Sequence, residues 1–437
     1  MYGPSRLLLF CCLLVSFGSL RAQKEKTTRF QPKPTLIRLI DNNLRQAATQ
    51  YKVLMSRVPP DRLPKTWYAN GDKLETSNSG WWTSGFYPGT LLYLYEFTRD
   101  TSLIREALQR LTLLEKEQYN KGTHDLGFMM YCSFGNALRL AQKGVLPLQP
   151  ASGPSAIATS ASRAISTSPA FLDSILLNSA HSLSTRFNPT VGCIRSWDSK
   201  PWKYPVIIDN MMNLELLFWA TRFSGDSSFY RIAVTHANTT MRNHYRPDYS
   251  SFHVVDYDTA TGNVIAKKTA QGYADSSAWA RGQVWGLYGF TAMYRNTHDP
   301  KYLDQAQHIA HFILTNPNLP PDKIPYWDFS APDIPHALRD VSAAAIMASA
   351  LIELSHYVPP ATAKGYIDVA EEIIVNLSSN TYKAVVGSNG GFILRHSVGH
   401  FPAKTEVDVP LTYADYYFVE AMLRYKQLGN ESTSSNK

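Results

Sequence analysis

A helical pattern that recurs three times is the feature that most constrains how this chain folds. Each copy has an aromatic and apolar stretch, a short turn around an aspartate, and a second stretch with apolar residues at helical spacing. The copies occupy residues 91–104, 216–230 and 290–303. Apolar residues three and four positions apart predict amphipathic helices, so each copy is predicted to be a helical hairpin. Because one hairpin cannot bury its own apolar face, repeated hairpins must stack on their neighbours.

Weaker copies of the pattern extend it through the rest of the chain. They lie around residues 136–186 and 349–378, and a closing helix is predicted over residues 413–425. About six pairs in roughly 400 residues suit either an open solenoid or a closed double ring. The first helix of each pair is the more apolar and aromatic, as an inner ring requires, and the second carries the charged face. We therefore predict an all-α fold, an (α/α)6 toroid or six-hairpin barrel, in one domain over residues 23–437.

Three segments depart from the hairpin pattern. Residues 151–169 are rich in Ser and Ala and nearly uncharged, which is typical of an inserted surface loop or a lid. The alternating segments 251–258 and 390–394 are expected to form minor β-hairpins. Such hairpins would decorate one rim of the toroid.

The N-terminus has the pattern of a secretory signal peptide. Arg6 precedes an apolar run over residues 7–15, and Ala22 ends a plausible cleavage site. No other stretch approaches the ~18 uninterrupted apolar residues of a membrane span. The sequence therefore predicts a signal peptide over residues 1–22 and an exported, soluble product without a membrane span.

The net charge and the number of cysteines limit which classes of binding partner and which disulfides are expected. The formal net charge is +8 for the whole chain, and it is +6 once Arg6 and Arg21 are removed with the signal. A mildly basic protein suits an acidic polysaccharide, and the absence of a dense Lys/Arg run argues against a nucleic-acid partner. Two cysteines remain after cleavage, Cys132 and Cys193, and the sequence leaves open whether they pair.

Two aspartates are the first candidates for chemistry. Asp209 follows the apolar run 206–208 at the start of a predicted helix, where it either caps the helix or serves a function. The preceding segment 196–205 is rich in aromatic residues, and Asp125 in the segment 124–128 is a second candidate. Paired carboxylates beside aromatic rings are typical of a site that cleaves sugars.

Five further residues form a polar and aromatic set. Arg281 and Trp285 are four apart on a predicted helix, so they share a face, although a stacked pair inside the core explains the spacing equally well. His253 lies in a strand-like piece where a structural histidine is the more common case. Gln271 carries no signal alone, and Trp82 is either a core ring or a platform for a pyranose.

Taken together, these motifs resemble the unsaturated glucuronyl hydrolases, glycoside hydrolase family 88. The matching segments span nearly all of the predicted mature chain. They are Gly-Trp-Trp-Thr-Ser-Gly-Phe at 80–86, His-Asp-Leu-Gly-Phe at 124–128, Asp-Asn-Met-Met-Asn at 209–213, and His253, Gln271 and Arg-Gly-Gln-Val-Trp at 281–285.

The resemblance implies an (α/α)6 toroid and an enzyme that removes a terminal 4,5-unsaturated uronic acid from oligosaccharides left by polysaccharide lyases. Chondroitin, hyaluronan or heparin fragments are the implied substrates, and the bacterial periplasm is the implied location. By the same resemblance Asp209 is the general acid and base and Asp125 the second essential carboxylate. The residues implied to bind the terminal sugar are Trp82, His253, Gln271, Arg281 and Trp285. No cofactor is implied.

Other interpretations stay open. A related unsaturated rhamnogalacturonyl hydrolase would act on pectin fragments with the same chemistry, and a non-catalytic exported glycan-binding protein would use the aromatic residues alone. A metal site is not predicted, because His308 and His311 lack an accompanying carboxylate pattern. Asp340 sits at another predicted inner-helix start, where helix capping explains it equally well.

Overall fold

The computed structural model describes Met1, residues 30–146 and residues 165–428. Within those residues the chain forms twelve α-helices, one π-helix and nine short strands. The predicted all-α class is therefore confirmed. Apart from Met1, the predicted signal peptide lies outside the described residues, as do positions 151–164 of the predicted insertion. Pro169, placed at the end of that insertion, is instead the first residue of a helix capped by Ser168.

The predicted hairpins are present. The three strong copies correspond to α2 with α3, α6 with α7, and α8 with α9, and the weaker copies to α4 with α5 and α10 with α11. The bounds are α2 Phe86–Thr98, α3 Thr101–Leu114, α4 Asn136–Gln142, α5 Pro169–Ser184, α6 Leu214–Ser224, α7 Ser227–Asn243, α8 Ala280–Thr297, α9 Pro300–Thr315, α10 Val341–Leu354 and α11 Pro360–Leu377.

The turn around an aspartate has one physical explanation in all three strong copies. The first helix ends at a residue in the left-handed conformation: Arg99, Gly225 or His298. The next residue is the aspartate, whose side chain accepts a hydrogen bond from the backbone N–H of the second residue of the following helix. A left-handed end followed by an aspartate cap reverses the chain within two residues.

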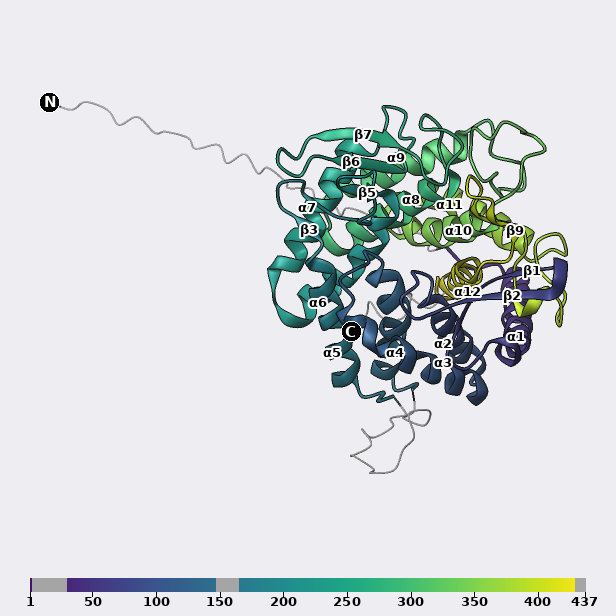
Figure 1. Ribbon diagram of the computed structural model, residues 1–437. Coiled ribbons are helices and arrows are strands. Elements are labelled where there is room, and N and C mark those ends of the chain that lie inside the picture. Colours follow the sequence, from purple (N-terminus) through teal and green to yellow (C-terminus); the bar gives the residue numbers. More distant parts are fainter. Residues whose placement is uncertain (2–29, 147–164, 429–437) are drawn as a thin grey trace, which may run out of the picture.

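The hairpins close into a ring. Each inner element packs on the next in the order α2, the π-helix Gly127–Gly135 with α4, α6, α8, α10 and α12 (Thr412–Gln427), and α12 packs back on α2. Figure 1 shows α12 lying between α10 and α2. All fourteen residues of α10 are buried, as an inner helix requires. The sequence pattern thus correctly favours the closed toroid over an open solenoid.

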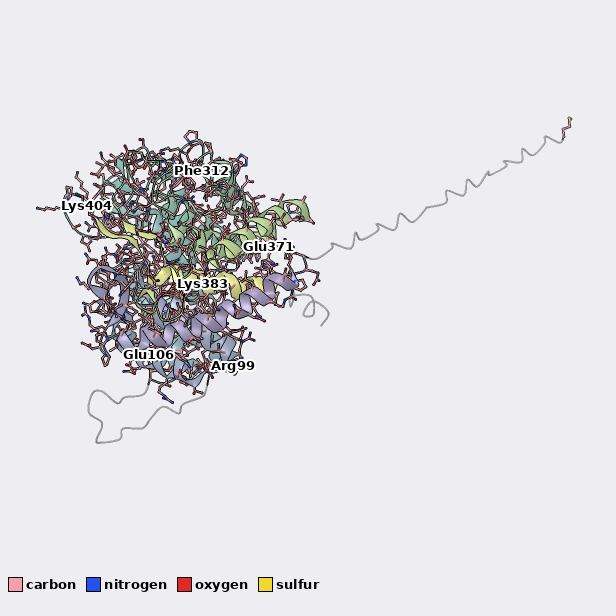
Figure 2. All side chains as sticks on the ribbon, turned by 90° about the vertical axis from the view of Figure 1, so that its right-hand side faces the viewer. Arg99, Glu106, Phe312, Glu371, Lys383 and Lys404 are labelled. Atoms are coloured by element: carbon pink, nitrogen blue, oxygen red, sulfur yellow. The ribbon has the colours of Figure 1, made fainter. Side chains whose placement is uncertain are left out.

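The outer partner of α12 is the N-terminal helix α1 (Pro34–Arg57), for which the sequence pattern makes no prediction. It crosses the front of the molecule in Figure 2, with Arg99 and Glu106 on one side and Glu371 and Lys383 on the other. The Lys383 ammonium donates to the side chain of Gln46 on α1 at 2.9 Å. Helix α1 also packs on α2 and α3 of the first hairpin and on α11 and α12.

All strands lie in connections that run from an outer helix to the next inner helix. They are β1 Leu63–Tyr68, β2 Lys73–Ser77, β3 Phe187–Asn188, β4 Cys193–Ile194, β5 Pro205–Ile207, β6 Val254–Tyr257, β7 Val264–Lys268, β8 Ser397–His400 and β9 Thr405–Val409. They pair as β1–β2, β3–β4, β5–β6–β7 and β8–β9, all antiparallel.

This placement gives the ring two different ends. The strands decorate the end where the inner helices begin, and the short reversals occupy the other end. The expected hairpin at 251–258 is present as β6 in a three-stranded sheet. The segment 390–394 forms no regular strand: residues 389–391 form a 3-10 turn in which Gly390 and Gly391 have positive φ, and the pairing is limited to an isolated antiparallel bridge between Leu394 and Lys383.

Candidate active site

Unpaired polar atoms gather where the inner helices begin. Several buried side-chain atoms there have no hydrogen-bond partner within the described part of the chain, although such atoms are usually satisfied in folded proteins. They are Asp209 Oδ2, Asn213 Nδ2, His253 Nε2, Arg281 Nε, Trp285 Nε1, Thr412 Oγ1 and Tyr413 Oη. Inner-helix N-termini also present the positive ends of helix dipoles, which favour an anionic ligand.

Asp209 is a buried acid rather than a helix cap. It lies in the 3-10 turn Ile208–Asn213 between β5 and α6, and the cap position of that turn is Ile207. Only 7% of Asp209 is exposed. Burial raises its pKa to about 7; the nearby charge of Asp125 adds to the rise, and Arg281 opposes it. Near neutral pH the carboxyl group can therefore both give and take a proton.

Asp125 lies just before the π-helix, beside the turn that carries Asp209. Its carboxylate accepts a hydrogen bond from the Thr123 hydroxyl at 3.1 Å, and His124 Nε2 lies 3.2 Å from its other oxygen. The two turns are tied together by Asn213, whose side-chain oxygen accepts from the Phe128 backbone N–H at 3.0 Å. The structure thus brings the two predicted carboxylates to one place.

His253 is a neutral donor at this site. Its Nδ1 accepts backbone N–H groups from Ala270 and Gln271, each at 3.1 Å, so the ring proton must sit on Nε2. Burial, with Arg281 adding to the effect, holds the pKa of His253 well below its usual value. Its Nε2 points toward Asp209 Oδ2 across 3.8 Å.

Arg281, at the start of α8, is held by the protein itself. Its Nη1 lies 3.0 Å from Asp340 Oδ2 and also donates to the Val398 carbonyl, and its Nη2 donates to the Gly399 carbonyl at 2.6 Å. The Gln271 side chain donates to the same Gly399 carbonyl at 2.9 Å. Two residues predicted to bind substrate therefore also anchor the β8–β9 hairpin to the site.

The predicted aromatic residues belong to one continuous layer. Phe128 lies between them, with its ring 5.6 Å from Trp82 and 5.1 Å from Trp285. Trp285 is fully buried, whereas Trp82 is partly exposed and packs 5.0 Å from Tyr413. Trp82 thus faces the open side of the layer, and Trp285 forms its base.

Sequence reasoning missed Tyr413 and Asn213 as parts of this site and left Asp340 aside as a helix cap. Tyr413 places its ring 5.3 Å from the Arg281 guanidinium and leaves its hydroxyl unpaired. Asp340 does cap α10 through Ser342, and it also forms the ion pair with Arg281. Asn213 could have been suspected because it ends the same short motif that begins at Asp209.

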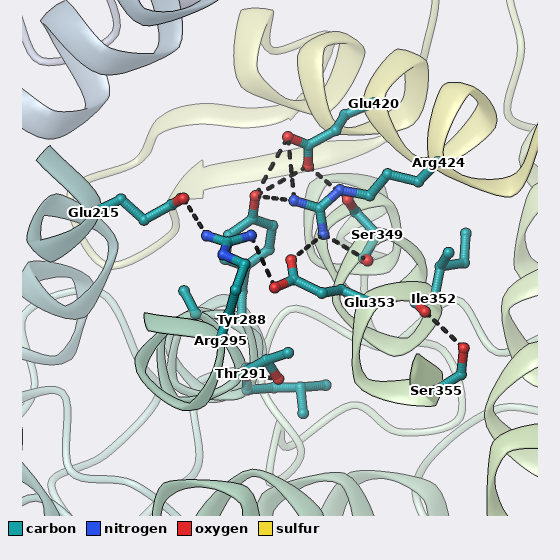
Figure 3. Close-up of polar contacts among 12 residues, drawn as sticks. Glu215, Tyr288, Thr291, Arg295, Ser349, Ile352, Glu353, Ser355, Glu420 and Arg424 are labelled. Atoms are coloured by element: carbon teal, nitrogen blue, oxygen red, sulfur yellow. Dashed lines mark hydrogen bonds and ion pairs between the residues drawn. The ribbon is translucent and has the colours of Figure 1, made fainter. Parts of the chain in front are cut away.

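A cavity of about 690 Å³ lies at the opposite end of the ring and is a weaker candidate. A cluster of charged residues from α6, α8, α10 and α12 adjoins this cavity, and Glu215, Glu420 and Arg424 of the cluster line it (Figure 3). Glu353 pairs with Arg295 at 2.8 Å and with Arg424 at 2.6 Å, and Arg295 also pairs with Glu215. None of the described residues lining this cavity has a buried polar side-chain atom without a partner. The charges there neutralise one another, so the unpaired atoms at the other end identify the better site.

The described residues contain neither a cluster of metal-ligand side chains nor a disulfide. No cluster of three or more His, Cys, Asp or Glu side chains suited to a metal ion occurs in residues 30–146 or 165–428. Cys132 and Cys193 are both free thiols, and burial raises the pKa of each. No helix in these same residues is long and apolar enough to cross a membrane.

Comparisons with known proteins agree with this geometry. An unsaturated glucuronyl hydrolase of Formosa agariphila is 45% identical over 349 residues, which cover 79% of this chain and 80% of that protein. An unsaturated chondroitin disaccharide hydrolase of Streptococcus pneumoniae is 30% identical over 79% of this chain and 81% of its own length. No family model matches the chain.

The fold of a solved structure agrees as well. A crystal structure of an unsaturated glucuronyl hydrolase specific for heparin superposes with a TM-score of 0.81 and 42% identity, covering 90% of this chain and 98% of that one. Identity at this level over most of both chains, together with a closed toroid, leaves one assignment. The chain belongs to the unsaturated glucuronyl hydrolases and is a glycoside hydrolase.

Proposed function

We propose that the enzyme removes the terminal 4,5-unsaturated uronic acid from glycosaminoglycan oligosaccharides produced by lyases. Chondroitin, hyaluronan and heparin fragments are the candidate substrates. The relatives support this class, since one is named for chondroitin disaccharides and a solved neighbour for heparin. The inner-helix N-termini and Arg281 add a positive environment that suits a uronate carboxylate.

In the first chemical step Asp209 acts as the general acid. In its protonated form it gives its proton to C4 of the C4=C5 double bond, and positive charge develops at C5 and the ring oxygen. The pKa of about 7 keeps a useful fraction of Asp209 protonated at neutral pH. This differs from an ordinary glycosidase, which protonates the leaving oxygen and develops charge at the anomeric carbon.

The second step uses the carboxylate left behind. Asp209 takes a proton from a water molecule while the oxygen of that water bonds to C5. This step restores the protonated acid and gives a hemiketal. The hemiketal bond between C5 and the ring oxygen then breaks to a ketone. The resulting hemiacetal at C1 collapses to an aldehyde and releases the neighbouring sugar.

The remaining residues bind and orient the sugar. The charge of Asp125 beside Asp209 raises the pKa of Asp209 through like-charge repulsion. His253 offers its Nε2–H, Arg281 its Nε–H, and Trp82 its exposed ring face for stacking. Gln271 anchors the β8–β9 hairpin to the pocket, and Trp285 forms the base of the pocket.

The observation that carries this proposal is Asp209, a buried acid with an unpaired oxygen among unpaired donors. The test is the ultraviolet absorbance of unsaturated disaccharides incubated with the purified protein, because hydration destroys the conjugated enol-carboxylate. Loss of absorbance with release of free hexosamine from chondroitin or heparin disaccharides is expected. Turnover of pectin-derived disaccharides alone would favour the rhamnogalacturonyl enzyme, and binding without turnover a glycan-binding protein.

Export to a bacterial periplasm is part of the same proposal. The sequence pattern of residues 1–22 supports it. Expression of the full chain in a Gram-negative host, followed by fractionation and N-terminal sequencing, tests it. A cytoplasmic protein that retains residues 1–22 would contradict it.

A further inference from the structure

We propose that Asp340 is a positioning residue for the reaction, because its carboxylate holds the Arg281 guanidinium in place and balances its charge at the site. This inference rests on the proposed hydration reaction. Asp340 would then have two roles, as the N-cap of α10 and as the partner of Arg281.

The ion pair is fully enclosed. Asp340 Oδ2 lies 3.0 Å from Arg281 Nη1, and the two side chains are 0% and 1% exposed. The other carboxylate oxygen accepts from the Ser342 backbone N–H at 3.1 Å and from its hydroxyl at 2.6 Å. One oxygen therefore caps α10 while the other faces Arg281, so the two tasks belong to different atoms.

The guanidinium has little freedom once Asp340 is in place. The carbonyls of Val398 and Gly399 accept from its terminal nitrogens. The rings of Trp279 and Tyr413 lie 4.5 and 5.3 Å from its central carbon. Nε is the one nitrogen of this side chain without a partner in the described part of the chain, and fixing the other two nitrogens fixes where its N–H points.

Asp340 also sets how strongly Arg281 acts on the acid. The titratable or charged groups that face Asp209 are Asp125 before the π-helix, His253 on the strand side, Arg281 on α8 and Tyr413 on α12. Arg281 is the cation among them and lowers the pKa of Asp209. Without the Asp340 charge the guanidinium is uncompensated, so the pKa of Asp209 must fall further.

Replacing Asp340 by Asn separates the two tasks. Asn is a good N-cap, and its side-chain oxygen can still accept from Ser342. Its amide group cannot accept from Arg281 Nη1, because both groups are donors. The variant therefore keeps the cap and removes the ion pair.

The experiment compares the pH dependence of kcat/KM for wild type and Asp340→Asn on an unsaturated disaccharide. We expect KM to rise and kcat/KM to fall by up to about a hundredfold, as a misplaced binding group causes. Activity needs protonated Asp209, so the basic limb of the profile moves to lower pH. Asp340→Ser, which also supplies a cap oxygen, gives the same readout should the asparagine variant not fold.

Asp415→Asn is the matched control. Asp415 is another fully buried aspartate in the first turn of an inner helix, but its oxygens accept from the Ile393 and Leu394 backbone N–H groups and contact no guanidinium. It is expected to change the melting temperature and leave the basic limb in place. A lower melting temperature with unchanged KM and pH profile in Asp340→Asn overturns the inference. If wild type turns over no unsaturated disaccharide at all, the proposed function fails instead.

Discussion

At the scale of single residues, environment decides what a carboxyl group does. Asp209, Asp226 and Asp340 all lie near helix starts, where the sequence pattern predicts caps. Asp226 is an exposed cap, Asp340 combines a cap with an ion pair, and Asp209 caps nothing and is buried with an unpaired oxygen. Of these three aspartates, only Asp209 is expected to exchange a proton with the substrate.

Asp209→Asn is expected to lower kcat by about a thousandfold or more while preserving the fold, because it removes the proton donor and keeps the side-chain shape. The absorbance assay measures turnover, and calorimetry measures binding of the unsaturated disaccharide. Asp226→Asn, at the opposite end of the ring, is the control and should remain active. A folded and fully active Asp209→Asn enzyme would contradict the assignment.

Asp415 provides a prediction about pH and stability. Burial raises its pKa to about 7, against the opposing Ile393 and Leu394 N–H groups, so the folded state holds a proton that the unfolded state has already lost. The free energy of unfolding therefore contains an Asp415 contribution on the order of a few kcal/mol. This contribution is fully present at about pH 4 and is lost as the pH rises to about 7. Asp415→Asn should therefore gain stability relative to wild type across that range.

The comparison has to be made as a difference between the two proteins. Burial lowers the pKa of His236 to about 3 and that of His244 to about 4, which opposes the aspartate effect in both proteins alike. Urea unfolding of both proteins at several pH values isolates the Asp415 contribution. A pH-independent difference in the free energy of unfolding would show that Asp415 titrates normally.

At the scale of elements, the π-helix and the 3-10 turn of residues 208–213 are forced into close approach. A Cβ on Gly127 would lie 2.4 Å from Asn213 Cα. Only glycine lets the two turns that carry Asp125 and Asp209 lie this close. The hydrogen bond from Phe128 to Asn213 then fixes their separation.

Gly127→Ala should push the two turns apart, lowering the free energy of unfolding by about 1–3 kcal/mol, as overpacking does, and reducing kcat. Gly365→Ala on the outer helix α11 is the control. Its Cβ meets nothing within 4 Å, so alanine should stabilise α11 by about 0.5–1 kcal/mol. Urea unfolding and the absorbance assay test both variants, and an unaffected Gly127→Ala would show that the turns can shift at no cost.

At the scale of the whole molecule, the two ends of the ring differ in kind. The site end keeps unpaired polar atoms, whereas partly buried ion pairs join α6, α8, α10 and α12 at the opposite end (Figure 3). Arg295 and Arg424 hold the pKa of Glu353 below its usual value even though burial opposes this. Glu353 is therefore ionised and links three inner helices.

Glu353→Gln leaves two partly buried guanidinium groups without this carboxylate and should lower the free energy of unfolding by up to about 3–5 kcal/mol, the cost of breaking a fully buried pair. The matched control is Asp368→Asn, which removes the exposed pair with Lys364 and should cost less than about 1 kcal/mol. Chemical denaturation measures both. Equal losses would mean that solvent screens the Glu353 pairs as well.

The sequence by itself determined the helical hairpins, the inner and outer faces and the aspartate turns, because helix period and capping are local. It also indicated the residues of the site, because their motifs resemble a known family. The tertiary structure alone decided at which end of the ring the unpaired polar atoms gather and that Arg281 meets Asp340 and the β8–β9 hairpin. It also decided that burial raises the pKa of Asp209 to about 7. These properties depend on burial and on contacts between residues far apart in the chain, which exist only once the ring has closed.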